Sequence, residues 1–166
     1  MFIKELNLKS FGKFHHKNII LKNGLNLVCG KNEAGKSTVH NFIETMLYGL
    51  GNDKNKNDES LFKRYRPWNY DQFNGSMIVE DDDGDYIIRK DFLDKSTSFS
   101  KKTPSSPNEE AIADYNSDME VGEYLFDINK SAFSNTLSIK QLSNSTNDEL
   151  AAQVKERILN LSQTKD

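Results

Sequence analysis

The sequence predicts an α/β domain built around one strand, one glycine-rich loop and one helix. Three observations support this. Residues 30–38, Gly-Lys-Asn-Glu-Ala-Gly-Lys-Ser-Thr, fit the pattern G-x-x-x-x-G-K-[ST] at every fixed position. Residues 25–29 just before them, Leu-Asn-Leu-Val-Cys, have the composition of a short buried strand. Apolar residues after the loop recur at helical spacing, namely Val39, Phe42, Ile43, Met46, Leu47 and Leu50.

This order of strand, loop and helix is typical of a phosphate-binding loop. Loop N–H groups and the helix N-terminus would face one point and favour an anion there. We expect Lys36 to reach the β- and γ-phosphates of ATP, as a catalytic residue, and the Ser37 hydroxyl to hold Mg²⁺. The alternative is a chance glycine turn before a helix. The predicted nucleotide-binding residues are Gly30, Lys31, Asn32, Glu33, Ala34, Gly35, Lys36, Ser37 and Thr38.

Composition limits the partners and the location of the protein. A net charge of -3 gives no general attraction to nucleic acid, so contact with DNA requires a local basic patch. The single cysteine, Cys29, excludes an intrachain disulfide and is expected to be a small buried core residue. No apolar run approaches the ~20 residues of a membrane span. The first residues alternate and carry charge, unlike a signal peptide, so we expect a cytoplasmic protein with no membrane partner.

Two strands are expected before the phosphate loop. Residues 2–9 alternate between apolar and polar, residues 10–14 form a turn around Gly12, and residues 17–21 form a second strand. Lys22-Asn23-Gly24 then has the Asn-Gly signal of a hairpin turn leading into the strand at 25–29. This order predicts an antiparallel portion beside a parallel core.

Residues 61–68 combine three cations, Lys63, Arg64 and Arg66, with interleaved aromatic residues. They indicate either a patch facing phosphate groups, of nucleotide or DNA, or a solvated loop whose aromatic side chains pack on the core. Residues 75–80 and 86–90 are expected to form a hairpin, and residues 92–101 a further strand.

The C-terminal part is expected to be mainly helical. Short helices are predicted over 117–126 and 129–135, a strand over 137–142, and a final helix from about residue 146 to the end. That last helix resembles the start of a coiled coil. The predicted organisation is therefore a lobe at 1–145 followed by a coiled-coil helix at 146–166.

Hydrolysis of ATP would also need an acidic residue that follows an apolar strand and holds Mg²⁺. The best candidates are Glu80 and Asp81, after Met77-Ile78-Val79. The acidic turn that follows favours a hairpin instead. The chain is therefore expected to carry only part of a hydrolytic site.

Several of these stretches together resemble the N-terminal half of the ABC-type ATPase heads of SMC, SbcC, RecF and YhaN-like proteins. They are residues 8–14, 24–28, 30–38 and 47–49. The Asn-Glu-Ala-Gly-Lys-Ser-Thr form of the loop, the Phe-Gly-x-Phe turn, and residues 65–68, 73–76 and 86–92 are most similar to the YhaN-like branch.

The resemblance implies a P-loop NTPase lobe with a mixed core sheet and an added antiparallel β subdomain. It implies that Gln141 contacts Mg²⁺ and the attacking water, as a catalytic and metal-binding residue; the alternative is a surface glutamine on an edge strand. It also implies a phosphate contact by Lys13. The acidic strand and the signature motif of the family lie in a C-terminal lobe.

The implied function is ATP-gated head dimerisation in DNA repair or chromosome maintenance. The implied partners are the protein's own C-terminal lobe, a second head in a homodimer, a nuclease subunit, and DNA held through its backbone. Lys63, Arg64 and Arg66, with Lys101 and Lys102, are candidates for that last contact. Two alternatives remain open: a nucleotide-responsive interaction module without turnover, and a self-contained P-loop NTPase or kinase that uses Glu80 or Asp81.

Overall fold

The computed structural model describes residues 1–51, 61–68 and 71–139 of the chain. The chain divides into two compact units, residues 1–121 and residues 122–166. All predicted site residues except Gln141 lie in the first unit. That unit contains every strand of the described part and the helix that follows the glycine-rich loop.

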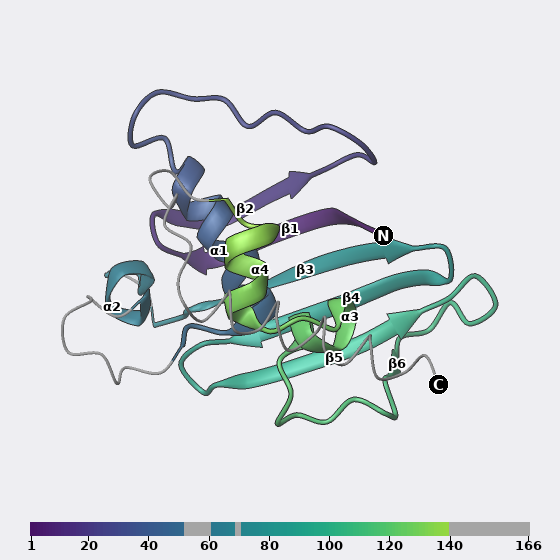
Figure 1. Cartoon of the computed structure of the whole chain (residues 1–166). Helices are drawn as coiled ribbons and strands as arrows, with labels where there is room; N and C mark the ends of the chain where they lie inside the picture. The colour runs from purple at the N-terminus through teal and green to yellow at the C-terminus, as the bar shows by residue number, and fades with distance from the viewer. Residues whose placement is uncertain (52–60, 69–70, 140–166) are drawn as a thin grey trace, which may run out of the picture. The chain divides into compact units, whose positions relative to one another are not determined.

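The first unit is organised on one six-stranded sheet with the order β2-β1-β3-β4-β5-β6 (Figure 1). Every pair of neighbouring strands is antiparallel. The predicted parallel core is therefore not found among the described residues. The strands are β1 (Phe2–Phe11), β2 (Phe14–Ile20), β3 (Asn74–Asp81), β4 (Gly84–Asp91), β5 (Ser96–Lys102) and β6 (Glu110–Ala111).

Two tight turns set the register of the sheet. Phe11 pairs with Phe14 around Gly12-Lys13, so β2 begins three residues before the predicted start. Gly12 has φ 57°, a conformation that favours glycine. In the predicted β3–β4 hairpin, which is confirmed, the Asp81 carboxylate accepts hydrogen bonds from the N–H groups of Asp83 and Gly84.

The segment before the loop differs from its prediction. Residues 25–29 form no strand, and Leu25 and Leu27 are 99% and 83% exposed. Cys29 is exposed rather than buried. The Asn-Gly turn leads into no hairpin; instead the Asn26 side chain bonds the backbone N–H and carbonyl of Lys22. An apolar run becomes a strand only where a neighbouring strand pairs with it, and no described strand does so here.

The core lies between one face of the sheet and the helix α1 (Lys36–Tyr48). Phe42 of α1 is fully buried and packs on β3 where Gly75 leaves room: a Cβ at Gly75 would lie 2.6 Å from the Phe42 ring. The ring of Phe11 lies 5.1 Å from that of Phe42 and stacks on Tyr65 at 5.0 Å. Tyr65 ends the short helix α2 (Leu61–Tyr65), which the core therefore fixes to the end of β1.

The second unit is helical in its described part. Helix α3 (Val121–Phe126) begins four residues after the predicted start, at the last residue of the first unit. Helix α4 (Lys130–Thr136) confirms the prediction, and Asn129 caps it by accepting a hydrogen bond from the Ala132 N–H. Residues 137–139 are not in a strand.

Gln141 and the predicted final helix from residue 146 lie outside the described residues. Across the parts of the chain that are described, no helix has both the length and the apolar character that a membrane crossing requires.

Candidate nucleotide-binding site

The glycine-rich loop leads directly into α1, and its side chains at 31–34 are exposed. The N–H of Ala34 donates to the carbonyl of Lys31 at 3.1 Å and closes a turn within the loop. Glu33 and Gly35 have φ of 63° and 101°, which bend the backbone sharply. Such alternation of backbone hand brings successive N–H groups toward one concavity, which suits an anion.

The N-terminus of α1 also fits a phosphate group. Gly35 occupies the cap position with no side-chain hydrogen bond, and the first turn contains no acidic residue. The first N–H groups of a helix have no partners within the helix, and the helix dipole places positive charge there. Because neither a polar cap nor a carboxylate offsets these groups, this end of α1 is suited to a ligand that carries negative charge.

The Lys36 side chain lies over the loop, and its contact with phosphate stays a prediction. Its ammonium donates to the carbonyl oxygens of Gly30 and Lys31, each at 2.8 Å. These bonds hold a positive charge at the mouth of the loop. The carbonyl oxygens are exchangeable partners, since a phosphate oxygen forms the stronger, charge-assisted bond with an ammonium group.

The β1–β2 turn folds over the same loop. The ammonium of Lys13 donates to the carbonyl of Glu33, and the Phe14 ring covers Gly35. A Cβ at Gly35 would lie 2.4 Å from a ring atom of Phe14. The structure thus brings Lys13 to the loop, while its contact with phosphate stays a prediction. Sequence reasoning missed Phe14, although the Phe-Gly-x-Phe motif contained the signal.

The described residues supply only part of a metal site near the loop. Ser37 is exposed in the first turn of α1, where the motif requires it. The described ranges contain no cluster of three or more His, Cys, Asp or Glu side chains suited to a metal. Ser37 can therefore supply one oxygen ligand, and Gln141 lies outside the described residues.

The acidic candidates Glu80 and Asp81 do not join the loop. They lie at the far end of β3 from Gly75, the residue on which α1 packs. Glu80 forms an ion pair with Lys4 at 2.8 Å, and hydrogen bonds from Lys4 to Glu80 and Asp85 raise the pKa of Lys4. The Asp81 carboxylate accepts the hydrogen bonds from the N–H groups of Asp83 and Gly84 in the β3–β4 turn.

The two groups of predicted DNA-contacting cations are separated. Lys63, Arg64 and Arg66 are exposed on and after α2, near the end of β1. Lys101 lies near the opposite end of the sheet, where its ammonium donates to the Tyr86 hydroxyl at 3.0 Å. That hydrogen bond raises the pKa of Lys101. The five cations therefore do not form one surface.

Segment 61–68 packs on the core in part, and its contact with phosphate groups stays a prediction. Tyr65 is 7% exposed and packs on the core, and its burial raises the pKa of its hydroxyl. Trp68 is 95% exposed. Arg66 lies 5.6 Å over the Phe62 ring, so an aromatic side chain supports a cation that remains accessible.

An open loop at an uncapped helix N-terminus, with a lysine over it, is typical of nucleotide-binding P-loop proteins. A family model described as AAA domain matches residues 5–166. The chain therefore belongs to the AAA domain family, which consists of P-loop ATPases found in SMC- and SbcC-like proteins. A search of curated proteins found no match.

The family confirms the predicted superfamily and the nucleotide-binding ATPase class, whose members usually bind Mg²⁺ as well. Similarity to the YhaN-like branch stays a prediction.

Proposed function

We propose that this chain is the ATP-binding lobe of an SMC/SbcC-like ATPase. In this proposal MgATP binding promotes pairing of two heads, and hydrolysis needs a C-terminal lobe. The observation that carries the proposal is the arrangement of Lys36 over a loop that ends in the uncapped N-terminus of α1. The fit of the loop to an anion and membership of an ATPase family both support it.

The residues of the chain would divide the binding between them. The loop N–H groups and the first turn of α1 would hold the phosphate chain, and Lys36 would exchange its two carbonyl partners for phosphate oxygens. Ser37 would donate a hydroxyl oxygen to the metal. When bound, MgATP supplies the phosphoanhydride bond whose cleavage can drive a change of assembly.

Isothermal titration calorimetry of MgATP tests the binding step. A charge-assisted contact to phosphate contributes roughly 1.5–3 kcal/mol, so Lys36→Ala is expected to weaken binding about tenfold or more. Lys17→Ala is the matched control, because Lys17 is an exposed lysine of β2 with no part in the loop. Equal affinities of Lys36→Ala and the wild-type protein would overturn the proposal.

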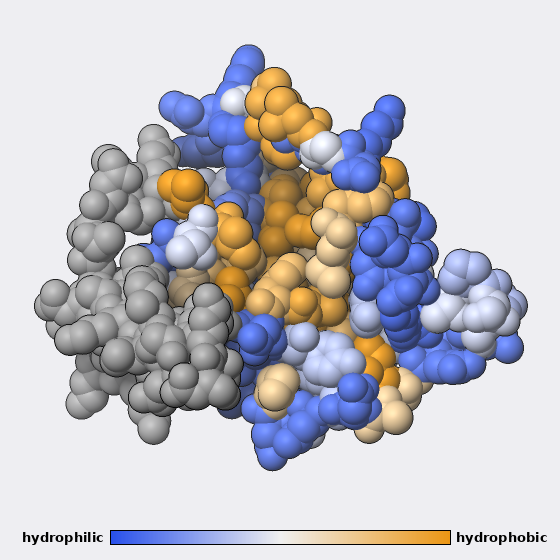
Figure 2. Space-filling view, turned by 45° about the vertical axis from the view of Figure 1, so that its right-hand side comes forward, coloured by the Kyte–Doolittle hydropathy of each residue, from blue (hydrophilic) through white to orange (hydrophobic). Residues whose placement is uncertain are grey.

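The requirement for a C-terminal lobe rests on two observations. Glu80 and Asp81, the acidic candidates, are engaged at the far end of β3. The segment that enters the loop exposes Leu25, Leu27 and Val28, and apolar side chains stand at the top of the face in Figure 2. This segment exposes apolar side chains, and its backbone pairs with no described strand. It is therefore suited to pairing with strands of a second lobe.

Phosphate release distinguishes this proposal from its alternatives. The isolated chain is expected to release no phosphate in the steady state, and addition of the C-terminal lobe to restore release. Release by the chain alone would contradict the half-site proposal. If Asp81→Asn then abolished that release, a self-contained NTPase that uses Asp81 would be favoured.

A nucleotide-responsive interaction module is the second candidate function. The absence of a carboxylate cluster near the loop among the described residues favours binding without turnover. Sedimentation with ADP, with ATP and without nucleotide tests this. ATP-dependent pairing without phosphate release in the presence of the C-terminal lobe would select the module over the ATPase.

The proposed role in DNA repair or chromosome maintenance, beside a nuclease subunit, rests on the resemblance and on a local basic patch. Lys63, Arg64 and Arg66 present three exposed cations on one short segment. If they contact DNA phosphates, affinity must fall as salt rises, and the triple alanine variant must flatten that dependence. Binding that is insensitive to salt would contradict this contact.

A further inference from the structure

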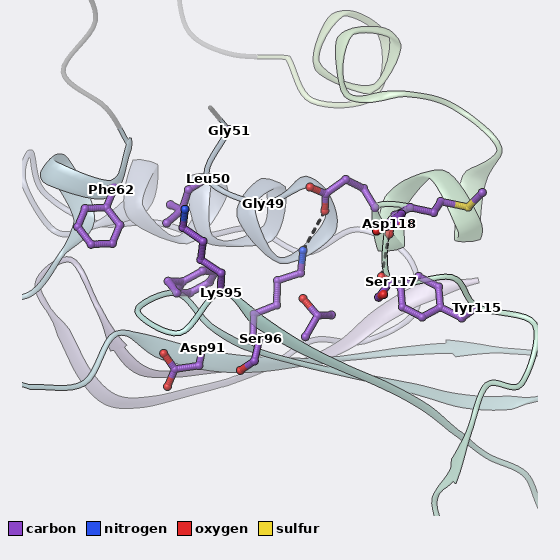
Figure 3. Close-up of a pocket in the computed structure, with 15 residues that line it drawn as sticks. Gly49, Leu50, Gly51, Phe62, Asp91, Lys95, Ser96, Tyr115, Ser117 and Asp118 are labelled. Carbon is purple, nitrogen blue, oxygen red and sulfur yellow. Dashed lines mark hydrogen bonds and ion pairs between the residues drawn. The ribbon is translucent and has the colours of Figure 1, made fainter. Parts of the chain in front are cut away.

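A cavity of about 430 Å³ lies at the C-terminal end of α1 (Figure 3). Gly49 and Leu50 at the end of α1 form one wall, and Lys95 and Ser96 at the β4–β5 turn form another. Helix α1 has 13 residues, so its two ends are separated by roughly 20 Å. The cavity is therefore distinct from the phosphate loop, which lies at the other end of the same helix.

Much of the cavity wall is apolar. Leu50, Phe62, Phe92 and Tyr115 line it, and Phe92 is only 5% exposed. Figure 3 shows Phe62 at one side of the cavity and Tyr115 at the other. Burial raises the pKa of the Tyr115 hydroxyl above its ordinary value of 10.0. Such walls favour a ligand with an aromatic or branched apolar body.

A buried cation is also present in the cavity. The side chain of Lys90, on β4, is 7% exposed, and its Nζ lies 3.1 Å from the Oε2 of Glu120. Within the described ranges Glu120 is its one partner. An ammonium group has three donor hydrogens, and a buried charge requires compensation by an opposite charge. Lys90 therefore provides a fixed point for an anion inside a cavity whose wall is in part apolar.

The two members of this ion pair differ in their access to water. The side chain of Glu120 is 44% exposed, whereas that of Lys90 is only 7% exposed. The Glu120 carboxylate can turn into solvent at little cost, but the Lys90 ammonium must keep a partner. An incoming carboxylate could thus take the place of Glu120 while Lys90 stays where it is.

The other charged groups of the cavity do not compete for Lys90. The Asp91 carboxylate accepts hydrogen bonds from the N–H groups of Leu93 and Asp94 and from the Asn74 amide. The Asp91 carboxylate therefore stabilises the β4–β5 turn and is not a partner of Lys90. Lys95 and Asp118 are exposed at the rim and lie against water.

We propose that this cavity binds a small apolar monocarboxylate, whose carboxylate pairs with Lys90 in place of Glu120 and whose apolar body contacts Phe62 and Phe92. The volume lies toward the lower end of the range for small-molecule sites, which suits a ligand of one or two rings. This site is independent of the nucleotide proposal, since it uses none of the loop residues.

The test is an amide-resolved NMR titration of the ¹⁵N-labelled chain with 2-naphthoate, and with 2-naphthamide as the neutral analogue of the same shape. Saturable shifts are expected for 2-naphthoate at Gly49, Lys95 and Ser117, and none at 30–37. The amide is expected to bind at least tenfold more weakly, because Lys90 gains no charged partner from it.

Two substitutions are expected to change affinity in opposite directions. Lys90→Met should weaken 2-naphthoate binding tenfold or more, whereas Glu120→Gln should strengthen it several-fold by removing the competing carboxylate. Lys101→Met is the control, since Lys101 is a partly buried lysine of the same sheet outside the cavity. A purely structural pair would give losses from both substitutions.

Three results would overturn the proposal. They are equal binding of the amide and the carboxylate, shifts confined to the exposed apolar residues 25–28, and weaker binding by Glu120→Gln. Should Lys90→Met fail to fold, Glu120→Gln alone decides, because it must strengthen binding of the carboxylate and leave binding of the amide unchanged.

Discussion

The backbone N–H of Gly12 donates a 2.7 Å hydrogen bond to the carbonyl oxygen of Tyr65. This bond joins the β1–β2 turn, whose next two residues contact the phosphate loop, to the end of α2. A Cβ on Gly12 would lie 2.9 Å from the methyl group of Thr38 and 3.2 Å from the Tyr65 ring. The loop is therefore held by a turn that is itself anchored on its outer side.

Gly35 is expected to be essential to the loop. Alanine there would adopt φ of 101° and meet the Phe14 ring, so Gly35→Ala should weaken MgATP binding tenfold or more in calorimetry. Gly24→Ala is the matched control, because Gly24 has φ of 95° but no atom within 4 Å of the added Cβ. It should cost about 1 kcal/mol of stability and leave affinity unchanged. Equal affinities of the two variants would contradict the role given to Phe14.

Lys13→Met is expected to weaken MgATP binding about fivefold. The ammonium of Lys13 already reaches the loop at Glu33, but it is exposed, so its contribution is screened to about 1 kcal/mol. Lys17→Met, on the strand β2 that follows the turn, should leave affinity unchanged. Titrations at low and high salt should show the Lys13 effect shrinking as salt increases. A salt-independent loss would indicate a structural role for Lys13 instead.

Phe11→Ala is expected to destabilise the fold by about 3–5 kcal/mol in urea unfolding. Phe11 is fully buried, and its ring contacts four others, those of Phe42, Tyr65, Phe73 and Phe92. Phe2→Ala, at the partly exposed start of β1, should cost less than half as much. If Phe11→Ala does not fold, Phe11→Leu should still give a smaller, measurable loss. Similar costs for Phe2→Ala and Phe11→Ala would contradict a core centred on Phe11.

Acid is expected to remove the stabilisation that Arg89 gives to Glu109. Their bidentate ion pair, at 2.7 and 2.8 Å, holds the pKa of Glu109 below its ordinary value of 4.5. A group whose folded pKa is depressed stabilises the fold above its unfolded pKa and loses that effect as pH falls through the folded pKa.

Thermal melts should therefore show Glu109→Gln less stable than wild type at pH 7, with the difference shrinking as pH falls below 4.5 and disappearing as pH passes through the lower pKa of Glu109 in the folded state. Asp82→Asn, at an exposed position of the β3–β4 turn, is the control and should show no such pH dependence. A Glu109→Gln difference that persisted at low pH would exclude the ion pair as its cause.

Much of the fold followed from local pattern. Alternation predicted β1, and the acidic Asp81–Gly84 turn predicted the β3–β4 hairpin, because each depends on neighbours in sequence. The predicted helix start at Asn129 agrees with the cap that this residue forms on α4, and a cap acts within one turn. Helix α3 begins four residues after its predicted start, because the terminal residues of a helix have few local determinants.

The predictions that were wrong concerned features that depend on residues distant in the sequence. Residues 25–29 have the pattern of a buried strand, yet Leu25 is exposed because no described strand pairs beside it. The basic residues near 63 and 101 looked like one group in the sequence, and the sheet separates them by its own length.

The sequence by itself determined the phosphate loop and the start of α1, because the motif specifies backbone conformation over nine adjacent residues. Only the tertiary structure decided what surrounds the loop. Phe14 covers the loop at Gly35, and Tyr65 anchors the turn that carries Phe14 through the Gly12 N–H. A cavity with a buried Lys90 forms at the far end of the same helix. These features arise from the packing of side chains that are distant in sequence, which local patterns do not encode.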